Sequence, residues 1–163
     1  MGLRLRLRPR ERIIINGCVV TNGDRRNTIT VSSFGQVLRS KDILLPENAE
    51  TPVEKLYLGV QMLLINNSAT KEEIQHINRL GSFAFISLNT DDERGRLLTA
   101  MERTHQGDYY KALSELRPIL KAPNKTDSVR EAYPSELEKA DEAFRASAAA
   151  QFTRLEKDQA ACS

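Results

Sequence analysis

Arginine is the residue type whose spacing suggests chemistry in this chain, because it recurs at every second position near the N-terminus. The alternating arginines are Arg4, Arg6, Arg8, Arg10 and Arg12, with leucines between the first of them. Successive side chains of a β-strand point to opposite faces, so residues 3–8 predict a strand with one apolar face and one cationic face. A row of positive charges on one face favours a polyanionic partner.

Positive charge is concentrated in the first 45 residues. This segment holds nine Lys or Arg against three Asp or Glu, a net charge of +6, whereas the other 118 residues hold fifteen against nineteen, a net charge of −4. The whole-chain charge of +2 therefore conceals a basic N-terminal part and an acidic remainder. Such asymmetry suggests a nucleic-acid or acidic partner for the N-terminal part alone.

Seven arginines are candidate contacts to RNA phosphates, because they fall in or beside the expected strands. They are Arg4, Arg6, Arg8, Arg12, Arg25, Arg26 and Arg39. Phe34 is the one aromatic residue in this part of the sequence, so binding would depend on phosphate contacts more than on base stacking. The alternative is a structural role, in which charges on an exposed strand discourage pairing with other chains.

Two short turns are expected to present these arginines. Asn16-Gly17 is a preferred pair for a two-residue hairpin turn, in which both residues adopt positive φ. Asn22-Gly23, followed by Asp24, supplies a second turn signal. Together with residues 3–8, the strands expected around these turns predict an antiparallel meander or small barrel.

The pattern changes beyond Pro46, where three helix starts of one type follow. Thr51, Thr70 and Thr90 each precede a Glu by three residues, the spacing of a capping box. Apolar residues three and four positions apart predict the inward face of each helix. For the third helix this face is expected to hold Leu97, Leu98, Met101 and His105.

These elements predict an α+β protein with two parts. Residues 1–45 are expected to form a basic antiparallel β domain, residues 50–156 a helical domain and residues 157–163 a frayed tail, with a loop at residues 121–134. No apolar run approaches the roughly 20 residues of a membrane helix, and two distant cysteines do not suggest a disulfide framework. A cytoplasmic protein without a membrane partner is therefore expected.

Motifs of catalytic and cofactor sites are missing from the sequence. It contains no glycine-rich phosphate loop, no Gly-x-Ser-x-Gly, no Cys-x-x-Cys and no His-x-x-x-His. We therefore expect no enzyme activity, no metal site and no cofactor.

One segment of the helical part suggests a protein contact. Gly107-Asp108-Tyr109-Tyr110-Lys111-Ala112-Leu113 resembles the turn between the helices of a tetratricopeptide repeat. Stable arrays need about three repeats and no second copy occurs, so a plain helical hairpin is the preferred interpretation. Tyr109 and Tyr110 are nevertheless candidate contacts to a protein partner.

The N-terminal residues also resemble a known family. The resemblance is carried by Leu5, Leu7, Pro9 and Glu11-Arg12-Ile13-Ile14-Ile15-Asn16-Gly17, by Thr21-Asn22-Gly23-Asp24-Arg25-Arg26, and by Leu38-Arg39, Lys41-Asp42-Ile43-Leu44 and Thr51-Pro52. These residues look like the flagellum biosynthesis repressor family FlbT of alphaproteobacteria. The resemblance implies a cytoplasmic post-transcriptional regulator that binds the 5′ untranslated region of flagellin mRNA and promotes its decay, although some members promote flagellin synthesis.

We therefore predict a repressor that binds flagellin mRNA and promotes its degradation or blocks its translation. The alternative is a flagellar assembly adaptor or chaperone-like protein, whose helical domain binds flagellin or a secretion partner. Besides flagellin mRNA, the expected partners are flagellin or another flagellar regulator. The direction of regulation, the RNA sequence and the existence of a homo-oligomer are left open by the sequence.

Overall fold

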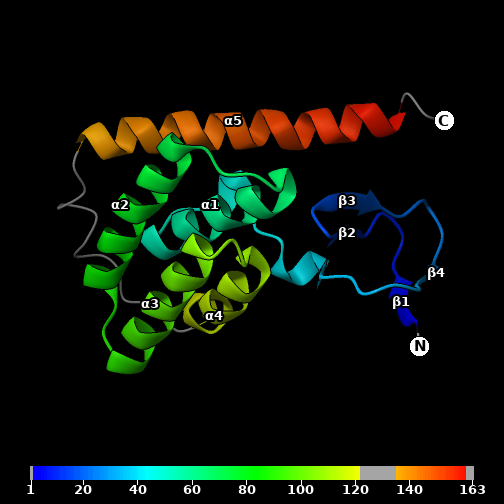
Figure 1. Ribbon diagram of the computed structural model, residues 1–163. Coiled ribbons are helices and arrows are strands. Elements are labelled where there is room, and N and C mark those ends of the chain that lie inside the picture. Colours follow the sequence, from blue (N-terminus) through cyan, green and yellow to red (C-terminus); the bar gives the residue numbers. More distant parts are fainter. Residues whose placement is uncertain (1, 122–134, 161–163) are drawn as a thin grey trace.

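The computed structural model describes residues 2–121 and 135–160, and its strands gather at one end of the molecule beside the helices (Figure 1). In these ranges, five short strands precede five α-helices. The predicted fold class, α+β with a small antiparallel N-terminal part, is confirmed. None of the helices described is long and apolar enough to span a membrane.

The strands form two small antiparallel sheets. One sheet pairs β1 (Leu3–Leu7) with β4 (Asn27–Val31), and the other has the order β3-β2-β5, made of Cys18–Thr21, Arg12–Ile15 and Val37–Leu38. A sequential meander would place β4 beside β3. The chain instead returns β4 to β1, so the antiparallel part is divided between two sheets.

Asn22 accounts for this return of the chain. Its side chain is buried, and its Nδ2 donates hydrogen bonds to the carbonyl oxygens of Arg8 at 2.7 Å and Arg25 at 2.8 Å. Its Oδ1 accepts a hydrogen bond from Nδ2 of Asn27 at 2.9 Å. These bonds hold the loop that leads into β4 against the end of β1, and β4 therefore pairs with β1.

β2 joins the two sheets to the helices because its successive side chains point to opposite sides. Ile13 packs with Leu5 and Leu7 of β1 in a small core between the sheets. Ile14 points the other way, into the main core that the first four helices share. The strand end of the molecule is therefore packed directly on the helices.

The first three helices begin where the sequence predicts, and the described residues contain five in all. They are α1 (Pro52–Asn66), α2 (Lys71–Ser87), α3 (Asp91–His105), α4 (Tyr109–Lys121) and α5 (Ser135–Ala160). The capping boxes at Thr51, Thr70 and Thr90 are all formed, with hydrogen bonds in both directions between the threonine and the glutamate. α1 is buried along most of its length, since α2 and α4 pack against it and α5 covers another side.

The predicted inward face of α3 is wrong in part. Leu97, Ala100 and Thr104 are the residues of α3 that are buried, whereas His105 and Leu98 are exposed. The buried residues are separated by three and four positions and therefore share one face of the helix. Leu98 follows Leu97 directly, so its side chain points about 100° away, toward solvent.

The segment between the strands and α1 is fixed by two side chains of α1. Gln61 is fully buried, and its amide both accepts from N–H of Leu44 and donates to the carbonyl oxygen of Leu44, each at 2.8 Å. The hydroxyl of Tyr57 donates to the carbonyl oxygen of Asp42 at 2.5 Å. This segment contains two short 3₁₀ turns, η1 (Ser40–Asp42) and η2 (Pro46–Asn48).

α5 packs across α1 and α2 (Figure 1). Ala148 and Phe152 contact Leu58 and Met62 of α1, and the ring of Phe144 lies 5.2 Å from that of His76. The helix continues to Ala160, four residues beyond the end predicted from the sequence. The loop predicted at residues 121–134 lies outside the described residues except for its first position, which belongs to α4.

Candidate nucleic-acid interface

Strand alternation sets the direction of the first arginines. Leu5 and Leu7 of β1 are buried in the small core between the sheets, so Arg4, Arg6 and Arg8 are all exposed on the opposite face. Burying the two leucines favours this register, because a shift by one residue would bury the arginines and expose the leucines.

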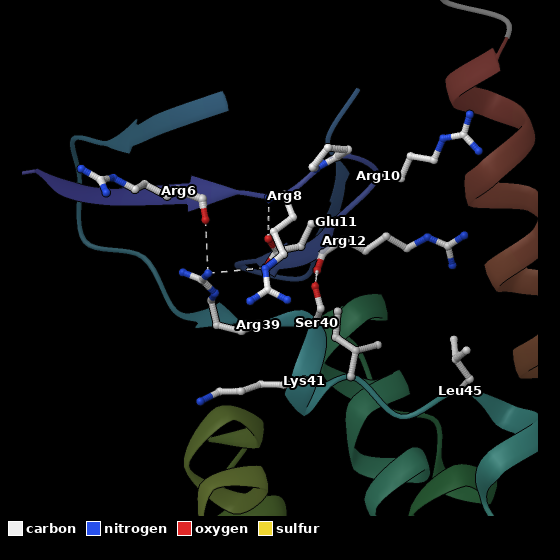
Figure 2. A pocket seen from close by; sticks show the side chains of 11 residues that line it. Arg6, Arg8, Arg10, Glu11, Arg12, Arg39, Ser40, Lys41 and Leu45 are labelled. Carbon is white, nitrogen blue, oxygen red and sulfur yellow. Dashed lines mark hydrogen bonds and ion pairs between the residues drawn. The ribbon is translucent and has the colours of Figure 1, made fainter. Parts of the chain in front are cut away.

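Arg6 and Arg8 line an open cavity of about 880 Å³ between the β1–β2 turn and the segment that leads to α1 (Figure 2). The lining residues are Arg6, Arg8, Pro9, Arg10, Glu11, Arg12, Arg39, Ser40, Lys41, Ile43 and Leu45. Six of these side chains are cationic and one is acidic. Figure 2 shows Arg10 and Arg12 extended beside each other on one side of the cavity, with Arg6 and Arg39 on the other.

Glu11 organises the cavity. Its carboxylate accepts a hydrogen bond from the backbone N–H of Arg8 at 2.7 Å and lies 3.5 Å from Nη2 of Arg39. The backbone bond from Arg8 lowers the pKa of Glu11, and the positive charges of Arg39 and Arg8 lower it further. Glu11 is therefore ionised at neutral pH, and it orients Arg39, whose Nη2 also donates to the carbonyl oxygen of Arg6 at 3.3 Å.

The structure brings four of the seven predicted arginines together. Arg6, Arg8, Arg12 and Arg39 line the cavity, whereas Arg4, Arg25 and Arg26 do not. Arg4 is exposed at the paired position of Thr30 on β4. Arg25 and Arg26 are exposed in the loop before β4. The predicted set therefore does not form one surface, and its role in RNA binding stays a prediction.

Two further cations of the cavity, Arg10 and Lys41, were missing from the predicted set. Arg10 has a φ of 57°, and its Nε donates to Asp24 at 2.9 Å, which connects the β1–β2 turn to the β3–β4 loop. Lys41 enters through the η1 turn. The arginine alternation extends to Arg10, but neither the turn geometry nor the path of residues 39–45 has a signal in the sequence pattern.

The four predicted turn residues play different roles. Asn16 and Gly17 have φ values of 49° and 83°, as expected of the preferred hairpin turn, and Oδ1 of Asn16 accepts from N–H of Gln36 at 2.8 Å. Asn22 acts through its side chain, whose buried hydrogen bonds fix the loop before β4. Gly23 accepts a hydrogen bond from N–H of Arg10 at its carbonyl oxygen, without positive φ.

The chemistry of the cavity is that of an anion site without a base-stacking platform. None of its lining residues is aromatic, so the groups it offers are guanidinium and ammonium donors. Such donors bind phosphate oxygens with little dependence on base sequence. Phe34, in the loop before β5, is 91% exposed and is the aromatic side chain of the strand end that is accessible for stacking.

The predicted protein contacts, Tyr109 and Tyr110, lie at the start of α4. Both rings are half-buried against the main core. The hydroxyl of Tyr110 donates to the carbonyl oxygen of Val37 in β5 at 3.2 Å, and the guanidinium of Arg117 lies 5.5 Å from its ring centre. Tyr110 thus connects the helices to the strands, and a protein contact at either tyrosine stays a prediction.

No metal site is found in residues 2–121 and 135–160. Within these ranges, no three His, Cys, Asp or Glu side chains are placed to hold an ion together.

Comparison with known proteins identifies what this chain resembles. A family model described as flagellar protein FlbT matches residues 3–126. A probable flagellum biosynthesis repressor protein FlbT of Rhodopseudomonas palustris strain TIE-1 is 37% identical over 121 residues, which cover 74% of this chain and 94% of that protein. The flagellum biosynthesis repressor protein FlbT of Caulobacter vibrioides strain ATCC 19089 is 32% identical over 121 residues, covering 74% of this chain and 85% of that protein.

No solved structure gives a significant match. The match to the family model ends at residue 126, before α5 begins at Ser135.

Proposed function

Because this chain belongs to the FlbT family of flagellar proteins, we propose that it represses flagellin synthesis by binding flagellin mRNA in its 5′ untranslated region. The relatives are named as flagellum biosynthesis repressors, and repression is a regulatory activity, not an enzymatic one. Bound in this way, the protein would promote degradation of the message or block its translation in the cytoplasm.

The observation that carries the proposal is the cationic cavity at the strand end. Arg6 and Arg8 face it from β1, Arg10 and Arg12 from the β1–β2 turn and the start of β2, and Arg39 and Lys41 from the segment before α1. Glu11 is the one carboxylate among the lining residues, and it holds Arg39 in place. A concave surface with this excess of positive charge attracts a polyanion.

Phosphate contacts supply most of the affinity in such a site. Each phosphate that a cation neutralises releases a bound counterion, so affinity falls as the salt concentration rises. For a single strand, the slope of log affinity against log salt is about −0.7 for each contact. The number of cavity residues that contact RNA can therefore be measured.

The test replaces Arg6, Arg8 and Lys41 together by Ala. Their side chains form no hydrogen bond or ion pair with the described part of the chain, so their loss should leave the fold intact. The expected result is weaker binding to the 5′ untranslated region of flagellin mRNA, with a salt slope shallower by about 2, for three contacts. Filter binding or fluorescence anisotropy at several salt concentrations measures both quantities.

A matched control removes the same net charge elsewhere. Lys71 and Arg79 of α2 and Lys139 of α5 are exposed, and replacing all three by Ala changes the charge of the protein equally. This control should keep the wild-type salt slope. If both triple variants weaken binding equally, or if neither does, the cavity is not the RNA site.

The arginines outside the cavity need a separate variant. Arg25→Ala with Arg26→Ala, and Arg4→Ala alone, show whether RNA continues beyond the cavity over the loop before β4 or along β1. A shallower slope in either variant extends the site in that direction. An unchanged slope restricts the site to the cavity.

A further inference from the structure

A second surface of the molecule is apolar and has no covering partner in the described residues. It is a groove of about 630 Å³ between α2 and α3, lined by Asn78, Gly81, Ser82, Phe85, Ile86, Leu97, Leu98, Met101 and His105. Ile86 is 70% exposed, Leu98 57% and Phe85 36%. Exposed apolar side chains that gather in one patch mark an interaction surface.

α2 packs closely on α3 beside the groove, and the contact uses only one face of α3. Gly81 of α2 lies so close to Met101 that a Cβ at this glycine would come within 2.8 Å of the methionine sulfur. Leu97, Ala100 and Thr104 occupy the buried face of α3. Leu98 is left on the outer side of this contact, where its side chain is exposed.

α3 carries a continuous seam on this outer side. The residues spaced three and four apart along it are Asp91, Arg94, Gly95, Leu98, Met101, Glu102 and His105. This spacing is that of a helix which packs lengthwise against another helix. Gly95 has no atom within 4 Å of the position of a Cβ, so a second backbone has room to approach closely there.

When the α3 helices of two copies are placed antiparallel, charged residues of one seam lie opposite residues of the other sign in the second seam. We propose that the groove is an interface between two copies of this chain, in which the two α3 helices cross antiparallel at Leu98. This crossing sets Arg94 opposite Glu102 of the second copy, Asp91 opposite His105, and Gly95 opposite Met101. A parallel arrangement would set Arg94 against Arg94 and Glu102 against Glu102.

This self-complementarity favours a second copy over a different protein. In a two-fold dimer each pair occurs twice, so the Arg94–Glu102 pairing is used on both sides of the axis. Glu102 has no cationic partner within the described ranges, since its Oε1 accepts from the uncharged Nε2 of Gln106. Arg94 donates to Asp91 at 3.2 Å and to the carbonyl oxygen of Leu88, and its guanidinium lies 5.8 Å from the centre of the Phe85 ring.

The first test measures mass as a function of protein concentration, by light scattering after size exclusion and by sedimentation equilibrium. The wild-type protein should be a dimer, and Leu98→Glu should be a monomer with an unchanged helical circular dichroism spectrum. Phe34→Glu is the matched control, because it places the same charge on an exposed apolar side chain outside the groove. Phe34→Glu should remain a dimer.

The second test identifies the orientation of the helices. In the antiparallel crossing, Glu102→Arg replaces the attraction between Arg94 and Glu102 by a repulsion between two arginines, and it should weaken the dimer about tenfold or more. In a parallel arrangement the same substitution would only exchange one pair of like charges for another and should leave the dissociation constant nearly unchanged. Adding Arg94→Glu to the same chain reverses both charges of the pair and should restore the wild-type dissociation constant to within about threefold.

Three results would overturn the proposal. The first is a wild-type protein that stays monomeric at about 100 μM, where even weak interfaces are populated. The second is a dimer that Leu98→Glu leaves unchanged. The third is a Glu102→Arg variant whose dimer Arg94→Glu does not restore. A monomeric wild type from which Leu98→Glu removes binding to flagellin would assign the groove to a different protein. None of these results depends on RNA binding.

Discussion

Gly17 is fixed by two independent constraints. Its φ of 83° lies in the left-handed region, which costs most side chains about 1–2 kcal/mol. A Cβ at this position would also lie 2.5 Å from the carbonyl oxygen of Leu64 and 3.2 Å from that of Ile65. These atoms belong to the backbone of α1, which cannot move without shifting the helix. The hairpin turn is therefore pressed against the end of α1.

A pair of substitutions separates the two constraints. Gly17→Ala is expected to lower the free energy of unfolding by about 3 kcal/mol or more, because it adds a collision with backbone to the left-handed strain. Gly107 is the control, since its φ is 78° but no atom lies within 4 Å of its Cβ position. Gly107→Ala should lose only about 1–2 kcal/mol. Equal losses in urea unfolding would mean that the contact with α1 is not rigid.

The site could be predicted from the sequence at the level of the strand but not at the level of the cavity. Alternation alone places Arg6 and Arg8 on an exposed face, because leucine burial selects the register. The presence of Arg39 and Lys41 in the same cavity depends on the path of the segment that Gln61 and Tyr57 hold. Such contacts join residues far apart in sequence, and no periodic pattern records them.

α5 is attached through a buried group of ionisable side chains. Asp141 is almost fully buried. Its carboxylate lies 2.6 Å from Nζ of Lys55 and 3.8 Å from Nε2 of His76. Burial lowers the pKa of His76 below its usual value of 6.5, with the charges of Arg79 and Lys55 acting in the same direction. The attraction of Asp141 opposes this shift of the pKa but is weaker than the effect of burial.

The docking of α5 is therefore expected to depend on pH. Because the docked state favours neutral His76, docking is strongest above pH 6.5 and weakens as the pH falls below it. Hydrogen exchange of the α5 amides at pH 7.5 and pH 5.5, corrected for the intrinsic exchange rates, should show the loss of protection. His76→Gln should remove this pH dependence, whereas His105→Gln, on the exposed side of α3, should keep it. Equal pH dependence in both variants would exclude His76.

The elements themselves differ in how far the sequence predicts them. The three capping boxes depend on residues three positions apart, and all three helix starts are correct. The partner of β4 and the outward direction of Leu98 are decided by tertiary packing. Asn22 selects β1 as the neighbour of β4, and Leu97 occupies the buried side of α3 in place of Leu98.

The whole molecule is expected to unfold as one unit, even though its sequence divides into a basic and an acidic part. The strands and helices share the main core through Ile14 and Leu38, and the hydroxyl of Tyr110 reaches the carbonyl oxygen of Val37 at 3.2 Å. The sheet of β1 and β4 has two strands, too few to be stable in isolation, and the third strand of the other sheet, β5, is two residues long. The strand end is therefore stabilised by the helices.

Tyr110→Phe tests this coupling. Removing the hydroxyl should lower the free energy of unfolding by about 1 kcal/mol, the usual net value of one hydrogen bond. The loss should be the same when it is followed by helical circular dichroism and by NMR signals of β2 and β5. Tyr109→Phe is the control, since its hydroxyl has no hydrogen bond within the described residues. Separate transitions for strands and helices would show two folding units.

The contact between Gly17 and the end of α1 also has a consequence for the timing of protein synthesis. Residue 17 leaves the ribosome first, but Leu64 and Ile65, against which it packs, are made later. At about 5–20 residues per second the delay is roughly 2–10 s. During this interval the arginine-bearing strands have been translated without the helix that holds them. The nascent chain therefore acquires its cationic cavity only after α1 has been completed.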